Sequence, residues 1–426
     1  MDRNSTVGSG KIRALFDAGT FVEVGAYVKK SDAGEYDGMI CGYGSVSGKL
    51  TFAFAQDMDR MKGAFGAVGA SKLKTLYQMA MKNGAPVIGI FESAGAVVYD
   101  GSAALSAYGS WVKCVADASG VVPQIALCSG VCAGTAAIIA SMFDFVLTVK
   151  DATQMYVTTP GADEVGCAAL CCADEAEAFA RARELVEFLP QNNRDSASAV
   201  ADDVNRAIAT ADVASLADFG KVITLHGDCA PDMQTALGYL GGELVAFVAL
   251  SGDLTPCAAK KAAKLVTFAD SFRIPVVTLI DSEGVPAAKA CATCYAKLAS
   301  AYAAATTPRV TAIVGKAYGA AFTLLGSRAL GADLVLATPD ATIGAMTPEK
   351  AVAFLWNDKI TNDKSRAEVE AEWVAEYATA QKAAASGDID DIVPVSELRM
   401  RLCSAIYMLA GAADEIPTRR HATLPL

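Results

Sequence analysis

Residues 86–96 read Pro-Val-Ile-Gly-Ile-Phe-Glu-Ser-Ala-Gly-Ala, and an altered copy, Pro-Val-Val-Thr-Leu-Ile-Asp-Ser-Glu-Gly-Val, follows 189 positions later at residues 275–285. In each copy, an apolar run typical of a buried strand leads into a turn that contains glycine. A second pair recurs at a similar offset: Gly-Val-Cys-Ala-Gly-Thr-Ala at residues 130–136 and Gly-Lys-Ala-Tyr-Gly-Ala-Ala at residues 315–321. The repeats predict a tandem duplication of one α/β unit.

The elements around these repeats are also expected in pairs. Apolar runs at residues 49–55 and 243–248 predict strands, and an amphipathic helix is expected after each. The apolar side of the first helix carries Leu73, Leu76, Tyr77 and Ala80, and that of the second carries Ala262, Leu265, Val266 and Ala269. Both copies are therefore expected to be complete domains.

The polar, Ala- and Asp-rich stretch from residue 192 to about 212 is the best linker candidate between them. We therefore expect domains at residues 1–208 and 209–426. A last helix is expected from about residue 396 to 412. It should pack on the second domain, because Leu398, Leu402, Ile406 and Leu409 keep helical spacing.

Charge and composition exclude several classes of function. A net charge of −11 argues against a nucleic-acid partner, because binding phosphates requires a dense basic surface. No apolar run reaches the roughly 18–20 residues that cross a bilayer, and the first residues lack the order of a signal peptide. We therefore expect a cytoplasmic protein.

The number and spacing of the cysteines and histidines argue against a metal centre. The chain has twelve cysteines, but only Cys291 and Cys294 form an isolated Cys-x-x-Cys, while Cys167, Cys171 and Cys172 fall in an Ala-rich run predicted to be helical. Reduced, buried cysteines are expected. With only two histidines, His226 and His421, a catalytic triad is also disfavoured. Catalysis is expected to use backbone groups, carboxylates, lysines or a borrowed cofactor.

The paired turns supply such backbone groups. Open α/β units bind ligands at the carboxyl ends of their strands, where these turns lie. The N–H groups of a helix start are unpaired, so donors near Gly134 and on the neighbouring turn, at Gly95 or Ala96, are placed to hold one negative oxygen. The alternative is that glycine and alanine only permit close packing of strand and helix. Recurrence of the turns in both copies favours function.

At these residues the chain resembles a known family. It is similar, nearly end to end, to the carboxyltransferase subunits of biotin-dependent acyl-CoA carboxylases, transcarboxylases and sodium-pumping acyl-CoA decarboxylases. The resemblance is carried by Leu-Phe-Asp-Ala-Gly-Thr-Phe-Val-Glu (15–23), Phe-Ala-Gln-Asp (54–57), Gly-Ala-Phe-Gly (63–66), Phe-Leu-Pro-Gln-Asn-Asn (188–193), Lys-Ala-Tyr-Gly (316–319) and Asp-Asp-Ile-Val-Pro (390–394). It implies an α/β fold made of two crotonase-like (ClpP/crotonase) β/α spiral domains in tandem.

The resemblance also implies an activity and a set of site residues. A short acyl-CoA would lie on the first domain, with its thioester oxygen held by N–H groups near Gly95, Ala96, Gly134 and Thr135. Carboxybiotin on a separate carrier protein would lie on the second domain, with its ureido oxygen held near Gly284, Val285, Gly319 and Ala320. The carboxyl group would move between them through two enolates, which requires no metal and no protein nucleophile.

Four side chains are further candidates for cofactor binding. Arg60 and Lys62 precede a predicted helix start and are the better candidates for CoA phosphates. Lys72 is a weaker candidate, equal to Lys74, which lies outside the four; a solvated helix face is at least as good an interpretation of both lysines. Tyr318, next to Gly319, is a candidate to line the biotin pocket. Its alternative is a packed tyrosine with a satisfied hydroxyl group.

Two turns depart from the family pattern. Residues 93–101 read Ser-Ala-Gly-Ala-Val-Val-Tyr-Asp-Gly where the family usually has Ser-Gly-Gly-Ala-Arg-Ile-Gln-Glu-Gly, so Val97 replaces an arginine. Residues 281–285 read Asp-Ser-Glu-Gly-Val where Asp-Val-Pro-Gly-Phe is usual, so Glu283 brings a carboxylate to the biotin side. The chain is expected to be an active carboxyltransferase, with a decarboxylating or altered enzyme and a non-catalytic acyl-CoA-binding or assembly subunit as alternatives.

The resemblance implies partners as well. The expected partners are a biotin carboxyl carrier protein, together with biotin carboxylase or the membrane subunits of a decarboxylase. The chain is expected to form a homo-oligomer, a dimer or hexamer, with sites between the first domain of one copy and the second domain of another.

Overall fold

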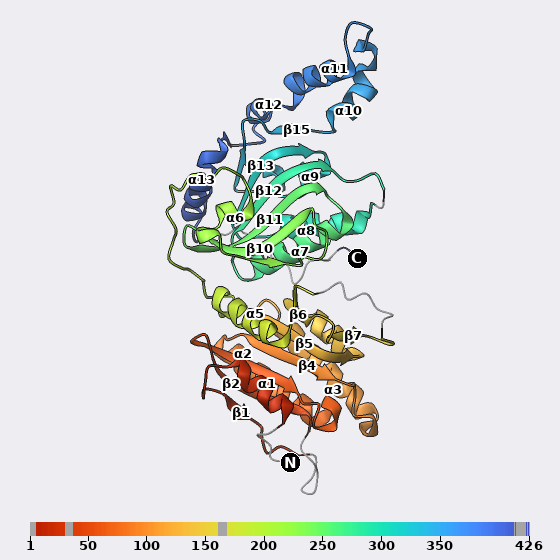
Figure 1. The fold of residues 1–426 in the computed structure, drawn as a ribbon, viewed down its shortest axis with the longest axis vertical. Coiled ribbons are helices and arrows are strands. Elements are labelled where there is room, and N and C mark those ends of the chain that lie inside the picture. The colour runs from red at the N-terminus through yellow and green to blue at the C-terminus, as the bar shows by residue number, and fades with distance from the viewer. Residues whose placement is uncertain are drawn as a thin grey trace. The chain divides into compact units, whose positions relative to one another are not determined.

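The fold is that of a computed structural model that describes residues 6–29, 37–160, 168–288 and 290–412, together with residues 414, 423 and 425 (Figure 1). The chain divides into two compact units, with the boundary between Ser196 and Ala197. The expected boundary, between residues 208 and 209, lies a little later in the chain. Cys167 and His421 lie outside the described residues.

The first domain is built on one sheet with strand order β1-β2-β3-β4-β5-β6-β8, in which β7 also pairs with β5. Neighbouring strands from β3 to β6 run parallel, whereas β2 runs antiparallel to both β1 and β3. The elements are α1 (Val7–Leu15), β1 (Val22–Val24), β2 (Met39–Val46), β3 (Lys49–Gln56), α2 (Ala67–Asn83), β4 (Val87–Ser93), α3 (Ser102–Ala118), β5 (Gln124–Ala133), α4 (Thr135–Ser141), β6 (Phe145–Val149), β7 (Gln154–Tyr156), β8 (Leu170–Cys172) and α5 (Glu175–Phe188).

Helices α2 and α3 close the core on one face of this sheet. The predicted apolar side of α2, including Leu73 and Tyr77, is fully buried against β3 and β4. The centre of the core is aromatic: the ring of Trp111 on α3 stacks on Phe91 and meets the edge of Phe54, with centroids 5.4 Å away in each case. Such a large buried aromatic cluster contributes strongly to stability and fixes the strand ends relative to the helices.

The second domain repeats this plan with strand order β16-β14-β13-β12-β11-β10-β9, in which β15 pairs with β13. Its elements are α6 (Val213–Leu216), β9 (Val222–Leu225), β10 (Met233–Leu240), β11 (Glu243–Asp253), α7 (Pro256–Ser271), β12 (Val276–Gly284), α8 (Ala292–Ala304), β13 (Arg309–Tyr318), α9 (Ala320–Leu324), β14 (Leu334–Ala337), β15 (Thr342–Gly344), α10 (Pro348–Ala351), α11 (Arg366–Trp373), α12 (Ala380–Ala385), β16 (Asp391–Ile392) and α13 (Val395–Met408). From β2 to β6 and from β10 to β14 the order of strands and α-helices is the same, and the second domain adds α10, α11 and α12 between β15 and β16 (Figure 1). The predicted duplication is confirmed.

An aspartate at the equivalent position of each copy accepts an equivalent backbone hydrogen bond. The carboxylate of Asp144 accepts a hydrogen bond from the N–H of Gln124 at 2.8 Å, and that of Asp333 accepts one from the N–H of Arg309 at 2.7 Å. Each aspartate therefore ties the start of the strand before its short helix to the start of the strand after it. This explains why both fall into the sequence register of the duplication.

Three local predictions have clear outcomes. The C-terminal helix is confirmed as α13, which buries Leu398, Leu402 and Ile406 in the core of the second domain. The helical prediction for Cys171 and Cys172 is wrong: both lie in β8, which pairs with β6, and the helix begins only at Glu175 after the cap from Asp174. No helix in the described ranges has the length and apolar character needed to cross a membrane.

Candidate functional site

In each domain the two predicted turns leave neighbouring parallel strands at matching positions. Ser93 at the end of β4 is paired with Cys132 on β5, and Ser282 on β12 is paired with Ala317 on β13. Ala96 and Thr135 each lie three residues beyond the first pair, and Val285 and Ala320 each lie three residues beyond the second. The sheet therefore brings the turns of each domain side by side at one edge.

The glycines at these turns have conformations that other residues rarely adopt. Gly134 has φ 66° and ψ −136°, and Gly319 has φ 56° and ψ −127°. These conformations with positive φ, which glycine adopts readily, let the chain leave the strand and enter a helix within one residue. On the neighbouring turns, the hydroxyl oxygen of Ser93 accepts from the N–H of Gly95 at 3.0 Å, and that of Ser282 accepts from Gly284 at 3.1 Å.

These contacts decide which N–H groups remain for a ligand. The N–H groups of Gly95 and Gly284 are bound to serine, and those of Gly134 and Gly319 donate to the carbonyl oxygens of Tyr156 and Gly344, each at 2.9 Å. The glycines therefore shape the turns. The donors that remain among the predicted set are the N–H groups of the residues that follow each glycine, namely Ala96, Thr135, Val285 and Ala320.

The local structure explains the availability of three of these N–H groups, those of Thr135, Ala320 and Ala96. Thr135 and Ala320 are the first residues of α4 and α9, where an N–H has no acceptor within the helix. Phe65 makes a hydrogen bond on each side of Ala96. Its N–H donates to the carbonyl oxygen of Gly95, and its carbonyl oxygen accepts from the N–H of Val97. Because this bridge is parallel, the N–H of Ala96 itself points away from Phe65.

Two of the four predicted cofactor-binding side chains are buried. The Lys72 ammonium donates to Asp37 at 2.5 Å and to the carbonyl oxygen of Met39 at 2.8 Å, with its side chain 3% exposed. Lys72 is thus neither on a solvated face nor available for a phosphate, and we exclude it from the proposed CoA site. The Tyr318 hydroxyl donates to Thr342 Oγ1 at 2.9 Å, so this side chain is packed and its hydroxyl group is satisfied.

The other two lie on the segment that precedes α2. Arg60 Nε lies 3.4 Å from a carboxylate oxygen of Asp57, and its side chain is 10% exposed. Lys62 is exposed, and both Met61 and Lys62 have left-handed backbones with φ of 51° and 55°. The carbonyl oxygen of Lys62 accepts from the N–H of Ala94, which joins this segment to the turn after β4. Lys62 is therefore the more accessible phosphate candidate.

Sequence analysis missed a lysine at this edge of the first domain. The Lys11 ammonium from α1 lies 2.6 Å from Glu92 and 2.7 Å from Glu175, and it also donates to Ser129. Burial opposes its charge, but hydrogen bonds to the two carboxylates outweigh this and raise the pKa of Lys11. No repeat or motif marks Lys11, because its partners come from three separate segments of the sequence.

The second domain has an acidic hollow of about 480 Å³ at the corresponding edge of its sheet. Its charged lining consists of Asp232, Asp253, Asp281, Glu283 and Lys316. The Lys316 ammonium lies 2.7 Å from Glu283, and this hydrogen bond lowers the pKa of Glu283 and raises that of Lys316. Within the described ranges, no cluster of three or more His, Cys, Asp or Glu side chains is arranged to hold a metal ion.

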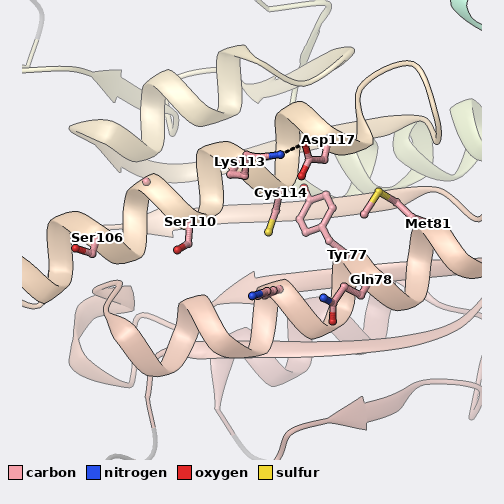
Figure 2. A pocket seen from close by; sticks show the side chains of 10 residues that line it. Tyr77, Gln78, Met81, Ser106, Ser110, Lys113, Cys114 and Asp117 are labelled. Atoms are coloured by element: carbon pink, nitrogen blue, oxygen red, sulfur yellow. Dashed lines mark hydrogen bonds and ion pairs between the residues drawn. The ribbon is translucent and has the colours of Figure 1, made fainter.

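A second hollow, of about 500 Å³, lies between α2 and α3 of the first domain. Figure 2 shows Tyr77 from α2 and Cys114 from α3 turned toward the space between the two helices, with Lys113 paired to Asp117 beside it. The Tyr77 hydroxyl donates to Gln124, the first residue of β5. This hollow is therefore near the amino ends of the strands, away from the paired turns.

The chain is similar over nearly its whole length to one group of known proteins. A family model described as "Carboxyl transferase domain" matches residues 1–165 and 162–424. The propionyl-CoA carboxylase beta chain of Saccharopolyspora erythraea is 32% identical over 98% of this chain and 90% of its own length. The methylmalonyl-CoA decarboxylase subunit alpha of Propionigenium modestum is also 32% identical, over 98% of this chain and 94% of its own length.

Solved structures agree with this result. A crystal structure of transcarboxylase 12S is described as a hexamer assembly with methylmalonyl-coenzyme A and methylmalonic acid bound. Its match to this protein covers 100% of this chain and 94% of the transcarboxylase chain. The TM-score is 0.91 at 30% sequence identity. The predicted fold class, an α/β tandem of two crotonase-like domains, is confirmed.

Proposed function

Because the chain belongs to the family of carboxyl transferase domains, we propose that it moves a carboxyl group between carboxybiotin on a carrier protein and the α-carbon of a short acyl-CoA. It is a biotin-dependent acyl-CoA carboxyltransferase, similar to subunits of carboxylases, decarboxylases and transcarboxylases alike. The observation that carries the finer proposal is the matched register of the two turns in each domain. On this proposal, Ala96 with Thr135 and Val285 with Ala320 would form one pair of N–H donors in each domain.

On the first domain, Ala96 and Thr135 would hold the thioester oxygen of the acyl-CoA. Two N–H donors stabilise that oxygen most when it becomes negative, which happens as the α-carbon loses its proton. The donors are backbone groups fixed by Ser93 and by the turn at Gly134, so they need little rearrangement during the reaction. Lys62 and Arg60 would lie toward the CoA phosphates.

On the second domain, Val285 and Ala320 would hold the ureido oxygen of biotin in the same way. Carboxybiotin supplies the carboxyl group when bound. Lys316 brings a positive charge to the acidic hollow beside these donors, and its ion pair with Glu283 offsets that charge. This pair would set how strongly an anionic carboxylated biotin is attracted to the second domain.

Two alternatives stay open for the physiological direction. Decarboxylation of an acyl-CoA would use the same donors in reverse, and the similarity to methylmalonyl-CoA decarboxylase subunit alpha favours it as much as the similarity to propionyl-CoA carboxylase beta favours synthesis. A non-catalytic acyl-CoA-binding role is the second alternative, and Val97 and Glu283, which depart from the family pattern, are the residues that favour it.

The proposed function predicts binding of acyl-CoA without covalent chemistry. Isothermal titration calorimetry with acetyl-, propionyl-, malonyl- and methylmalonyl-CoA should detect at least one ligand with a Kd between about 1 µM and 1 mM, or roughly −8 to −4 kcal/mol. Mass spectrometry of the intact protein after exposure should show no acyl adduct. Absence of binding by all four would overturn the acyl-CoA proposal.

The ion pair in the acidic hollow predicts opposite effects for its two partners. Glu283→Gln removes the negative partner of Lys316 and should lower the KM for the carboxybiotin carrier, whereas Lys316→Gln should raise it. Because both side chains are more than half exposed, each change should stay within about fivefold. Steady-state kinetics with acyl-CoA saturating measures both, and the double variant should lie between them. Shifts of the two single variants in the same direction would contradict this electrostatic role.

Each domain supplies one pair of donors, so a reaction between two substrates requires two domains to face each other. Exposed apolar side chains are available for such contacts: Val98, Tyr99 and Leu105 beside the first-domain turn, and Phe354, Leu355 and Tyr377 in the second domain. We therefore expect light scattering to report a dimer or hexamer. A stable monomer with full carboxyl transfer would rule out a site shared between copies.

A further inference from the structure

Two cysteines at the start of α8 hold their sulfur atoms in contact. Cys291 immediately precedes the helix and Cys294 lies in its first turn, and the Cys294 thiol donates to Cys291 Sγ at 3.0 Å. Cys291 is partly exposed, whereas Cys294 is 5% exposed. One sulfur can therefore be reached by a small reagent, and the second lies directly behind it.

The surroundings of the pair favour a reactive thiolate at Cys291. The hydrogen bond from Cys294, together with those from Thr293 and from backbone N–H groups, lowers the pKa of Cys291 to about 7. The same contact, with burial, raises the pKa of Cys294. Near neutral pH the accessible sulfur is thus partly a thiolate and the protected one stays a thiol, which is the division between an attacking and a resolving cysteine.

A metal site is a poorer account of this pair. Zinc held by cysteines requires four ligands in structural sites and three in catalytic ones. Among the residues that the structure describes, no third ligand joins these two sulfurs, because no group of three metal-binding side chains is found. Two sulfurs in contact without further ligands are instead suited to forming a bond with each other.

We propose that Cys291 and Cys294 are a redox-active dithiol whose oxidation to an intramolecular disulfide alters the hydrogen bonding of the turn at Gly284. The oxidant is a small disulfide such as glutathione disulfide. The Cys291 thiolate attacks one of its sulfur atoms and releases one thiolate. Cys294 then loses its proton and attacks Cys291 Sγ, which releases the second thiolate. The two cysteines are oxidised by two electrons and the small disulfide is reduced to two thiols.

The link to the turn is a short chain of hydrogen bonds. Tyr295, next to Cys294, donates its hydroxyl to the carbonyl oxygen of Leu254 at 3.0 Å, and the N–H of Leu254 donates to the carbonyl oxygen of Gly284 at 3.0 Å. Bond formation brings the sulfurs from 3.0 Å to about 2 Å and so shifts the first turn of α8. That shift is expected to weaken the bond from Leu254 to Gly284.

The oxidation is tested on the full chain in glutathione buffers of increasing oxidised fraction. Trypsin should release residues 290–297 as one peptide that contains both cysteines, because Lys289 and Lys297 bound it. Oxidation should remove two hydrogen atoms from its mass and block both sulfurs from alkylation, and dithiothreitol should reverse this. A peptide that stays reduced or carries only glutathione at every ratio would overturn the proposal.

The effect on the turn is tested by amide hydrogen exchange, which does not depend on carboxyl transfer. In the oxidised wild type the Leu254 amide should exchange about fivefold faster, the size expected when one ordinary hydrogen bond is lost. Cys294→Ser should show no change under the same buffers, whereas Cys257→Ser, which removes an exposed cysteine outside the pair, should respond as wild type. A disulfide that forms without any change at Leu254 would overturn the coupling to the turn.

Discussion

Thr135→Pro should lower the rate of carboxyl transfer by about 10²–10³-fold, the usual effect of losing one donor from an oxyanion hole. The substitution removes the N–H that we assign to the thioester oxygen. Because the acyl-CoA oxygen carries more negative charge in the transition state than in the bound substrate, kcat should fall more than the affinity for acyl-CoA. Single-turnover kinetics and acyl-CoA titration measure the two effects separately.

The structure makes proline an unusually clean probe at this position. Thr135 is the first residue of α4, where proline is well tolerated because that N–H has no partner in the helix. Proline also restricts the residue before it to extended conformations. Gly134 has φ 66° and ψ −136°, the mirror image of such a conformation, and glycine adopts both forms about equally readily.

Ala320→Pro makes the same change at the equivalent position of the second domain. Ala320 follows Gly319 at the start of α9, with nearly the same backbone angles at the glycine. We expect this variant to bind acyl-CoA with wild-type affinity and to lose transfer to or from biotin. The pair of variants therefore separates the two substrates between the two domains.

Matched controls keep the N–H and change only the side chain. Thr135→Ala and Ala320→Ser should each retain transfer within about threefold, because the proposed donor is the backbone. All four variants should be compared by circular dichroism and thermal midpoint before kinetics. If Ala320→Pro lost acyl-CoA affinity while Thr135→Pro kept it, the domains would have been assigned to the wrong substrates. If both proline variants kept full transfer, the turns would serve packing alone.

The duplication can be predicted from the sequence alone, and a candidate site can be proposed from it, because both leave local patterns. Apolar runs followed by glycine turns mark strand ends wherever a parallel sheet is buried, and the copies confirm each other. Ser93 and Ser282 belong to the repeats, but the contacts of their hydroxyl groups with the N–H groups of Gly95 and Gly284 are set by backbone geometry. Only the structure could therefore separate the glycines that shape each turn from the residues that would donate.

Lys72 shows the limit of a helical pattern. Its position off the apolar side of α2 and its charge predict a solvated helix face or a contact with a CoA phosphate. In the fold, Asp37 and the carbonyl oxygen of Met39 come from a distant segment and bind its ammonium, so the side chain is buried. Lys11 was missed for the same reason, since its partners Glu92 and Glu175 are far away in sequence.

The second prediction concerns a buried arginine that no sequence pattern singled out. Arg399 lies on the buried face of α13 and is fully buried, with Nη2 2.5 Å from the carboxylate of Asp218. Its Nε donates to the carbonyl oxygen of Leu216 at 3.0 Å, and Nη1 donates to that of Asp203. The guanidinium thereby fastens residues 203–218, part of which was predicted to be linker, onto the second domain.

Arg399→Met should lower the free energy of unfolding of the second domain by about 3–5 kcal/mol, because it leaves Asp218 as a buried charge without its partner. For a domain of this size, that loss corresponds to a fall in Tm of at least about 6 °C. Arg401→Met is the matched control, two residues further along the same helix. Arg401 is 49% exposed and lies 3.9 Å from Asp391, so its loss should change stability by no more than about 1 kcal/mol.

Removing both partners separates the cost of an unpaired charge from the loss of the other contacts. Arg399→Met with Asp218→Leu should recover part of the stability, since no buried charge remains. Recovery should be incomplete, because Asp218 also accepts from the N–H groups of Gly241 at 3.0 Å and Gly242 at 2.8 Å, which would then lack an acceptor. Calorimetric Tm values of Arg399→Met, Arg401→Met and the double variant measure these changes in stability. A double variant less stable than Arg399→Met would mean that Asp218 acts mainly on those glycines, and equal Tm values for Arg399→Met and Arg401→Met would remove the buried pair as a determinant of stability.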